Sequence, residues 1–200
     1  MSVQTRTYRK ARRAELEEAT RRRITESAVA LHERIGPAKT SITAIAKRAG
    51  VRRSTVYRHF PDEEALFAAC SSHFRALNPP PDLAGWTKIA DPKTRTATAL
   101  RELYAFYRRT HRMYESLFRD ETLVPVVGRR LRDFYGYLQA GQDALLAGHN
   151  LRGGAKQRTR AAIGHALAFS TWRSLTQEEG LSADDAATLM CRLIENASRR

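Results

Sequence analysis

Apolar residues recur at helical spacing along most of the chain, and no segment shows the alternation of a half-buried strand. The first periodic stretch predicts a helix over 20–35, which Gly36-Pro37 then ends. A second helix, about two turns long, is predicted to follow the N-cap residues Thr40 and Ser41 and to end at Gly50, which can adopt the left-handed conformation. The first part of the chain is therefore predicted to consist of short helices.

Two further short helices are predicted before a run of three prolines. One carries Val56 and Phe60 on its apolar side, and Pro61-Asp62 opens the next, which carries Leu66. The segment 78–82, Asn-Pro-Pro-Pro-Asp, blocks helix continuation and marks the end of this unit.

Beyond the prolines the periodic segments are longer, and all of them are helical. In Ala161–Leu175 small residues alternate with large apolar ones, which permits close approach between helices. Ser182 is placed to cap a last helix over Ala183–Ala197, with two acids in its first turn. The pattern as a whole predicts an all-α fold.

The chain is strongly basic, and the charge is densest at its start. Its 200 residues hold 35 Lys and Arg against 21 Asp and Glu, a formal net charge of +14. Residues 1–75 contain sixteen of the basic and eight of the acidic residues, a surplus of +8. Eight basic residues lie between Arg6 and Arg23 with few large apolar neighbours, which predicts a flexible basic arm. Such a surplus favours polyanionic partners, with nucleic acid first and an anionic membrane surface second.

The composition argues against several other classes of protein. A hydrophobic content of 42% is too high for a disordered chain. No apolar run approaches the ~20 residues of a membrane span, and the first 23 residues lack the apolar middle of a secretory signal. Cys70 and Cys191 form no disulfide framework and lack metal-site spacing. We expect a cytoplasmic protein without a metal or cofactor. We also expect no membrane role, since the arginines of the arm have no apolar anchors beside them.

The segment 41–60 has the pattern of a helix-turn-helix. Ile45 and Ala46 face inward on its first helix, Gly50 makes the turn, and Val56 closes the corner. In this arrangement the second helix enters the major groove of DNA with its N-terminal residues towards the bases. The outward-facing residues, which are the candidate DNA contacts, are Thr40, Ser41, Lys47, Arg52, Arg53, Ser54, Thr55, Tyr57, Arg58 and His59.

Two arginines at the start of the second helix are the best candidates for reading bases. A guanidinium can bridge O6 and N7 of a guanine, so Arg52 and Arg53 are predicted to contact guanines. Phosphate contacts position the protein without reading sequence. They are assigned to Thr40, Ser41, Lys47, Tyr57 and His59.

The run from Ala28 to Phe74 resembles the DNA-binding region of the TetR (tetracycline-repressor) family. That family carries an Ile-Ala pair, an Ala-Gly-Val turn and a Thr-x-Tyr-x-x-Phe helix at fixed spacing. The corresponding residues here are Ile45-Ala46, Ala49-Gly50-Val51, Thr55-Val-Tyr57-Arg-His-Phe60 and a following Glu64-Ala-Leu66. Two positions depart from the pattern. Glu63 replaces the family's usual lysine, which loses a phosphate contact, and Arg52 replaces a small polar helix cap.

The resemblance implies an architecture and a function. It implies a three-helix DNA-binding domain, a fourth, linking helix, and a larger helical domain for ligand binding and dimerisation. We accordingly expect a basic N-terminal arm over 1–19, a helix-turn-helix DNA-binding domain with its linking helix over 20–78, and an effector-binding and dimerisation domain over 79–200. The expected function is regulation of transcription by a ligand-responsive repressor that binds a palindromic operator on double-stranded DNA as a homodimer.

The resemblance also implies roles for the C-terminal helices. Ala161–Leu175 and Ala183–Ala197 match the two helices that pair with those of a second subunit. An apolar or aromatic effector, fixed by a few polar groups, is expected among the aromatic residues of the second domain. The candidate ligand contacts are Tyr104, Tyr107, His111, Phe118, Phe134, Tyr137, His165, Phe169 and Trp172.

Two other classes of function are alternatives. One is a DNA-binding regulator without a small-molecule effector, controlled by a protein partner or by oxidation of Cys70 or Cys191. The other is an enzyme, which we do not expect, because the chain shows no phosphate-binding glycine loop, nucleophile elbow, His-Glu metal helix or dinucleotide fingerprint. The acids of the second domain, such as Asp120 beside Arg119, have the spacing of surface pairs on a helix.

Overall fold

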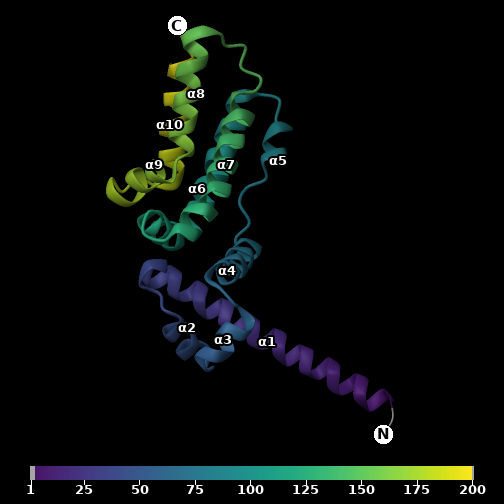
Figure 1. Cartoon of the computed structure of the whole chain (residues 1–200). Coiled ribbons are helices and arrows are strands. Elements are labelled where there is room, and N and C mark those ends of the chain that lie inside the picture. Colours follow the sequence, from purple (N-terminus) through teal and green to yellow (C-terminus); the bar gives the residue numbers. More distant parts are fainter. Residues whose placement is uncertain (1–2, 200) are drawn as a thin grey trace. The chain divides into compact units, whose positions relative to one another are not determined.

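The structure is a computed structural model that describes the backbone of residues 3–199 and the side chains of residues 8–199. Within this range every regular element is a helix, as the periodicity predicted (Figure 1). The elements in chain order are α1 (Val3–Ile35), the 3-10 turn η1 (Pro37–Lys39), α2 (Ile42–Ala49), α3 (Arg53–His59), α4 (Glu63–Leu77), α5 (Leu83–Thr87), α6 (Pro92–Asp120), α7 (Pro125–Leu146), α8 (Gly153–Leu167), α9 (Phe169–Arg173), the π-helix η2 (Ser174–Glu178) and α10 (Ala183–Ser198).

The helices form two compact units. The first runs up to Leu77 and also includes Arg112–Leu131, where α6 ends and α7 begins. The second consists of Asn78–His111 and the chain from Arg132 onward. The division after Leu77 lies at the proline run. No periodicity in the sequence indicates that residues 112–131 pack with the N-terminal helices.

One apolar core joins α1 to α4 in the first unit. Ile24 and Ala28 of α1 and Ile45 of α2 are at most 2% exposed, and they cluster with Val56 of α3 and Leu66 of α4. These are residues that the helical spacing placed on inward faces. The core therefore fixes which side of α2 and α3 remains in contact with solvent.

The basic arm is helical, so the prediction of a flexible segment is wrong for its described part. α1 begins at Val3 and continues without interruption to Ile35, while residues 1 and 2 lie outside the described range. No glycine or proline interrupts this stretch, and most of its residues have good helix propensity. Ion pairs between side chains four residues apart add support at Arg13 and Glu17 (3.2 Å) and at Arg22 and Glu26 (3.9 Å).

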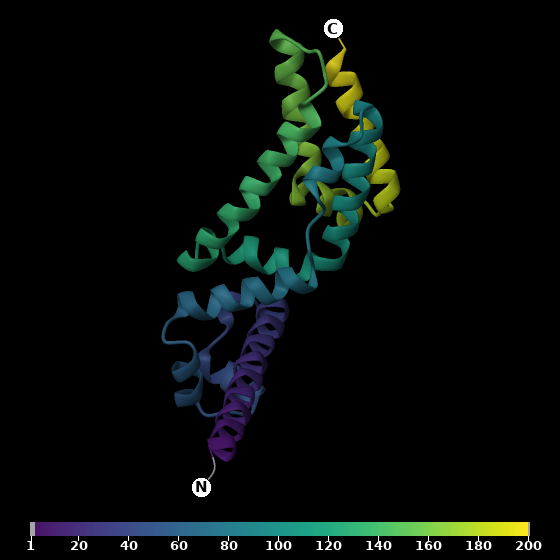
Figure 2. The same ribbon diagram turned by 90° about the vertical axis from the view of Figure 1, so that its right-hand side faces the viewer.

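The second unit has an aromatic core. Trp86, Tyr104, Tyr107 and Trp172 are all at most 1% exposed, and the indole N–H of Trp86 donates to Glu102 at 2.7 Å. α8 and α10 pack side by side (Figures 1 and 2). Ser182 caps α10, as predicted, by accepting the amide N–H of Asp185 at 3.1 Å.

The helix predicted over Ala161–Leu175 is interrupted, and this prediction is wrong. α8 ends at Leu167, Ala168 has an extended backbone (φ −67°, ψ 136°), and α9 begins at Phe169. The hydroxyl of Tyr104 donates to the carbonyl of Ala166 at 3.0 Å, and that of Tyr107 donates to the carbonyl of Leu167 at 2.6 Å. Hydrogen bonds from α6 thus replace helical ones at the break, and local sequence carries no signal for them.

Candidate nucleic-acid interface

The helix-turn-helix is shaped by local signals. Ser41 begins α2, because its Oγ accepts the amide N–H of Ala44 at 3.1 Å. Gly50 ends α2 in the left-handed conformation (φ 66°, ψ 38°), and the amide of Val51 donates back to the carbonyl of Ala46 at 3.0 Å. α3 begins without a side-chain cap, since Arg52 at its N-cap makes no such hydrogen bond. The turn therefore has the geometry that the sequence predicted.

Burial divides α3 into an inner and an outer face. Val56 and Phe60 are at most 2% exposed and anchor the helix in the core. None of the ten predicted DNA contacts is buried. Thr40, Thr55 and His59 are half-buried, and the exposed residues are Ser41, Lys47, Arg52, Arg53, Ser54, Tyr57 and Arg58. The outer face of α3 thus carries three arginines.

Two of the predicted phosphate contacts also hold the local backbone. The hydroxyl of Thr40 donates to the carbonyl of Gly36 at 2.7 Å, and Ser41 is the cap of α2. Lys47 is exposed on α2 and has no such structural role among the described contacts. Thr40 and Ser41 are therefore held in fixed positions at the entrance to the helix-turn-helix.

His59 differs from the other predicted contacts. Its Nε2 is buried without a hydrogen-bond partner within the described part of the chain. Burial, followed by the charges of Arg58 and Arg21, lowers the pKa of His59 below its ordinary value. The ring is therefore neutral at pH 7, and any hydrogen bond that it gives to a phosphate lacks a positive charge.

Arg21 has a structural role that the sequence pattern did not reveal. Its Nη1 donates to the carbonyl of His59 at 2.7 Å, and its guanidinium lies 4.3 Å from the centroid of the Phe60 ring. Sequence analysis grouped Arg21 with the basic residues of the arm. In the structure it fixes the end of α3 on α1, through a cation–π contact and a hydrogen bond.

The start of α4 is held at two points. Asp62 caps it, because its Oδ1 accepts the amide N–H of Ala65 at 2.7 Å. Glu64 accepts hydrogen bonds from Arg129 at 2.7 Å and from Arg130 at 2.6 Å, both on the part of α7 that belongs to the first unit. The hydrogen bond from Arg129 is the main cause of a lowered pKa at Glu64.

The end of α1 is held by the last turn of α6. Asp120 is 2% exposed, and its Oδ2 accepts the amide N–H of Ala38 at 3.0 Å. Arg119 donates to Asp120 at 2.8 Å and to the carbonyl of Ile35 at 3.1 Å, and it lowers the pKa of Asp120. Gly36 (φ 87°) passes so close that any side chain there would collide with both residues. The prediction that Asp120 lies on the surface is therefore wrong. The connection between α1 and α2 covers this residue, which helical spacing alone cannot show.

Comparison with known proteins identifies this arrangement. Residues 24–70, which run from the last part of α1 to the middle of α4, match the family model for bacterial regulatory proteins of the tetR family. Residues 24–70 thus form a DNA-binding region of the TetR family. Together with the exposed arginines on α3, this makes the chain a DNA-binding transcriptional regulator.

Solved structures share the fold of this chain over most of its length. A TetR-like transcriptional regulator from Rhodococcus sp. RHA1 is 20% identical, with a TM-score of 0.65 over 88% of this chain and 94% of that one. Another transcriptional regulator from the same organism is 18% identical, with a TM-score of 0.59 over 90% and 98%. A TetR transcription regulator from Haloarcula marismortui is 12% identical, with a TM-score of 0.56 over 90% and 97%. No curated protein matches the chain.

Most of the predicted ligand contacts gather around Tyr107 in the second unit. Four of the predicted contacts have ring centroids 5.3–6.4 Å from that of Tyr107, namely Tyr104, Phe134, Phe169 and Trp172, and the Phe106 ring also lies within this range. His111 extends this aromatic cluster through a contact at 6.2 Å with Trp172, and Tyr137 does so at 6.1 Å from Phe134. Trp172 Nε1 is buried in the cluster without a hydrogen-bond partner among the described residues.

Two predicted ligand contacts lie outside this cluster. Phe118 belongs to the first unit, where its ring is 5.9 Å from that of Tyr114. His165 is exposed, and its Nδ1 lies 3.3 Å from the hydroxyl of Thr171. The structure therefore brings together seven of the nine predicted contacts and leaves these two apart.

Burial disfavours the thiolate form of both cysteines. Cys70 is 5% exposed, and burial raises the pKa of its thiol to about 12. Burial also raises the pKa of Cys191. Oxidation needs the thiolate, so both thiols are poorly reactive near neutral pH. Among the described residues, no three His, Cys, Asp or Glu side chains are grouped to hold a metal ion, and no helix is long and apolar enough to cross a membrane.

Proposed function

We propose that this protein is a ligand-responsive repressor that binds a palindromic operator as a homodimer. The observation that carries the proposal is the outer face of α3. Arg52, Arg53 and Arg58 are exposed there, while Val56 and Phe60 hold the opposite face in the core. A short helix held in this way can enter a major groove with its guanidinium groups towards base edges and phosphates.

Two exposed leucines support the homodimer. Leu189 is 44% exposed and Leu193 is 42% exposed, and they lie one turn apart on α10, which packs against α8. Large apolar side chains grouped on one exposed helix face are typical of an interface. Twofold pairing there would present two copies of α3 to half-sites about 34–36 Å apart, one turn of DNA.

The aromatic cluster supports an apolar or aromatic effector. It consists of packed aromatic rings, and the buried N–H of Trp172 offers one donor to a ligand with an acceptor atom. Sites that combine apolar walls with a few polar groups are typical of small-molecule binding. Control by oxidation, the alternative, is disfavoured because burial raises the pKa of both thiols.

α6 is the element through which we propose that the effector acts. It carries Tyr104 and Tyr107 of the aromatic cluster, and its last turn carries Arg119 and Asp120, which hold the end of α1 within the first unit. A ligand that displaces α6 would therefore change how the helix-turn-helix is held. Effector and operator must then weaken each other by the same factor, because the coupling of two binding sites is reciprocal.

Selection of bound DNA from a random pool tests the proposal. We expect the enriched sequences to be palindromic, with half-sites about one helical turn apart. Enrichment of a single, asymmetric half-site would contradict the homodimeric arrangement. Retention of DNA without any enriched sequence would contradict the assignment of Arg52 and Arg53 as base contacts.

A further inference from the structure

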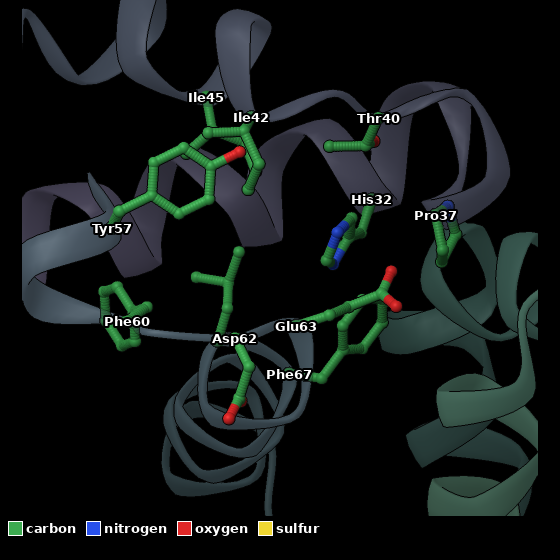
Figure 3. A pocket seen from close by; sticks show the side chains of 11 residues that line it. His32, Pro37, Thr40, Ile42, Ile45, Tyr57, Phe60, Asp62, Glu63 and Phe67 are labelled. Carbon is green, nitrogen blue, oxygen red and sulfur yellow. The ribbon is translucent and has the colours of Figure 1, made fainter. Parts of the chain in front are cut away.

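A cavity of about 250 Å³ lies inside the first unit (Figure 3). Its walls come from α1, η1, α2, α3 and α4, and much of its surface is apolar. The apolar side chains are those of Pro37, Ile42, Ile45, Phe60, Leu66 and Phe67. Pockets for drug-sized ligands measure roughly 300–1,000 Å³. This cavity therefore suits a smaller molecule, with one ring or one branched chain.

A buried histidine points into the cavity. His32 is 4% exposed, and its ring stacks on that of Phe67 at 4.7 Å between centroids. Figure 3 shows its imidazole in the space between Thr40 and Phe67, where it lines the cavity. Burial lowers the pKa of His32 to about 4, so the ring is neutral at pH 7 and offers one donor and one acceptor. The ring nitrogens of His32 are not among the fully buried side-chain atoms that lack a partner, so a ligand in the cavity can reach them and hydrogen-bond to them.

The charged residues that line the cavity are both acidic. Asp62 already caps α4, whereas the carboxylate of Glu63 lies on the same side of the cavity as His32 and Pro37 (Figure 3). The lining residues include no lysine or arginine. The exposed carboxylate of Glu63 favours a cation, because it accepts a charge-assisted hydrogen bond from an ammonium group.

The cation that fits this lining is organic. In the described part of the chain, no three potential ligands are grouped to hold a metal ion, so Glu63 and His32 lack the third partner that a metal needs. We propose that the cavity binds a small organic amine, whose ammonium contacts Glu63 and whose single ring or branched chain lies against the apolar wall. His32 hydrogen-bonds to a polar atom of the same molecule.

The position of this site connects it to DNA. Thr40 and Tyr57 line the cavity and are also predicted phosphate contacts. The amine and the operator would therefore contact the same side chains. Binding of either one should change the affinity for the other, and by the same factor. This consequence rests on the proposed DNA contacts, whereas binding of the amine itself does not.

Titration of the full-length protein with benzylamine, without DNA, tests the site. Benzyl alcohol and benzoate serve as matched probes with the same ring and with no charge or the opposite charge. We expect benzylamine to shift the NMR signals of the His32 ring and to bind at least about tenfold more tightly than either analogue, because only the ammonium pairs with Glu63. Equal binding of the three probes, or binding of none, would overturn the proposal.

Two variants locate the binding. Glu63→Gln keeps the size of the side chain and removes its charge, so benzylamine should bind about tenfold more weakly or worse. Glu115→Gln removes an exposed carboxylate of the same unit that does not line the cavity, and it should bind benzylamine like the unmodified protein. An equal loss in both variants would show a general charge effect and would contradict a site at Glu63. Because no DNA is present, these outcomes are distinguishable from a failure of the repressor proposal.

Discussion

The two units of the protein end their functionally important helices in different ways. In the first unit, Ser41 and Gly50 set the ends of α2 through contacts within five residues along the chain. In the second unit, the break at Ala168 is held by Tyr104 and Tyr107, which lie 62 and 60 residues away from their hydrogen-bond acceptors. The helix-turn-helix is therefore specified by local contacts, whereas the break in the second unit depends on how α6 packs against α8.

This difference bears on function. A local cap is insensitive to what binds elsewhere, which suits a helix-turn-helix that must present the same face to each operator. A break held from another helix changes when that helix moves, which suits a region that responds to a ligand. The predictions below separate the two kinds of support, in order of decreasing expected effect.

The largest effect is expected where the break at Ala168 is held. The double variant Tyr104→Phe, Tyr107→Phe leaves two buried carbonyls without donors, which should lower the free energy of unfolding by roughly 2–6 kcal/mol. Equilibrium unfolding in urea measures this loss, with Tyr8→Phe, at a 67% exposed position, as the control. If the double variant were as stable as the control, the break would be held by local sequence after all.

Acid should weaken the first unit through His32. The pKa of its ring falls from 6.5 to about 4 on folding, mainly because of burial, although Asp120 opposes this. The unfolded chain therefore binds more protons between these values. Stability from this group is complete above pH 6.5 and is lost as the pH falls to about 4, a change on the order of 3 kcal/mol.

The variant His32→Phe isolates that contribution. His59 and His149 also have lowered pKa values, so the unmodified protein has a pH slope from more than one group. Unfolding free energies measured between pH 7 and pH 4 should depend less steeply on pH in His32→Phe than in His73→Gln. Equal slopes in the two variants would mean that folding does not lower the pKa of His32.

The range of the interactions decides what the sequence could reveal. The caps at Ser41 and Ser182 and the turn at Gly50 were predictable, because each depends on residues a few positions away. The break at Ala168 and the burial of Asp120 were not, because both depend on partners more than fifty residues distant in the chain. The helical arm is a different kind of error, since its residues have helix propensity but lack the apolar face by which helices are recognised.

The candidate site follows the same rule. The ten predicted DNA contacts all lie outside the core, because helical periodicity distinguishes inward from outward positions. The ligand contacts were chosen by residue type alone, and Phe118 belongs to the other unit as a result. The cavity beside His32 is formed by five elements, so no spacing along the chain indicates it.

An exposed side chain on the helix-turn-helix should affect DNA binding without affecting the stability of the fold. Arg53→Ala is expected to weaken binding to the selected operator by about 1–3 kcal/mol and to relax the preference at one base step. Fluorescence anisotropy on operator and on unrelated DNA measures both effects, with the exposed Arg34→Ala as the control. A uniform loss on all DNA would reassign Arg53 to a phosphate.

Two glycines allow a matched test of the turn. Gly50 (φ 66°) and Gly180 (φ 72°) both have left-handed backbones with open space where the Cβ of an alanine would lie, so alanine at either costs roughly 1–2 kcal/mol of backbone strain alone. Gly50→Ala should also lower DNA affinity, because it changes how α3 leaves the turn, whereas Gly180→Ala should not. A normal DNA affinity in Gly50→Ala would show that the turn tolerates another geometry.

The smallest expected effect comes from the two serine caps, which accept amide N–H groups at the same distance of 3.1 Å. Ser41→Ala and Ser182→Ala should each cost about 1 kcal/mol of stability. Only Ser41→Ala should also weaken DNA binding, since Ser41 is a predicted phosphate contact.

Ser41→Asp separates the two roles, because aspartate caps a helix equally well but repels a phosphate. Urea unfolding should therefore show it to be as stable as the unmodified protein, while its DNA affinity falls below that of Ser41→Ala. An affinity equal to that of Ser41→Ala would place Ser41 away from the phosphates and leave it only the local role of capping α2.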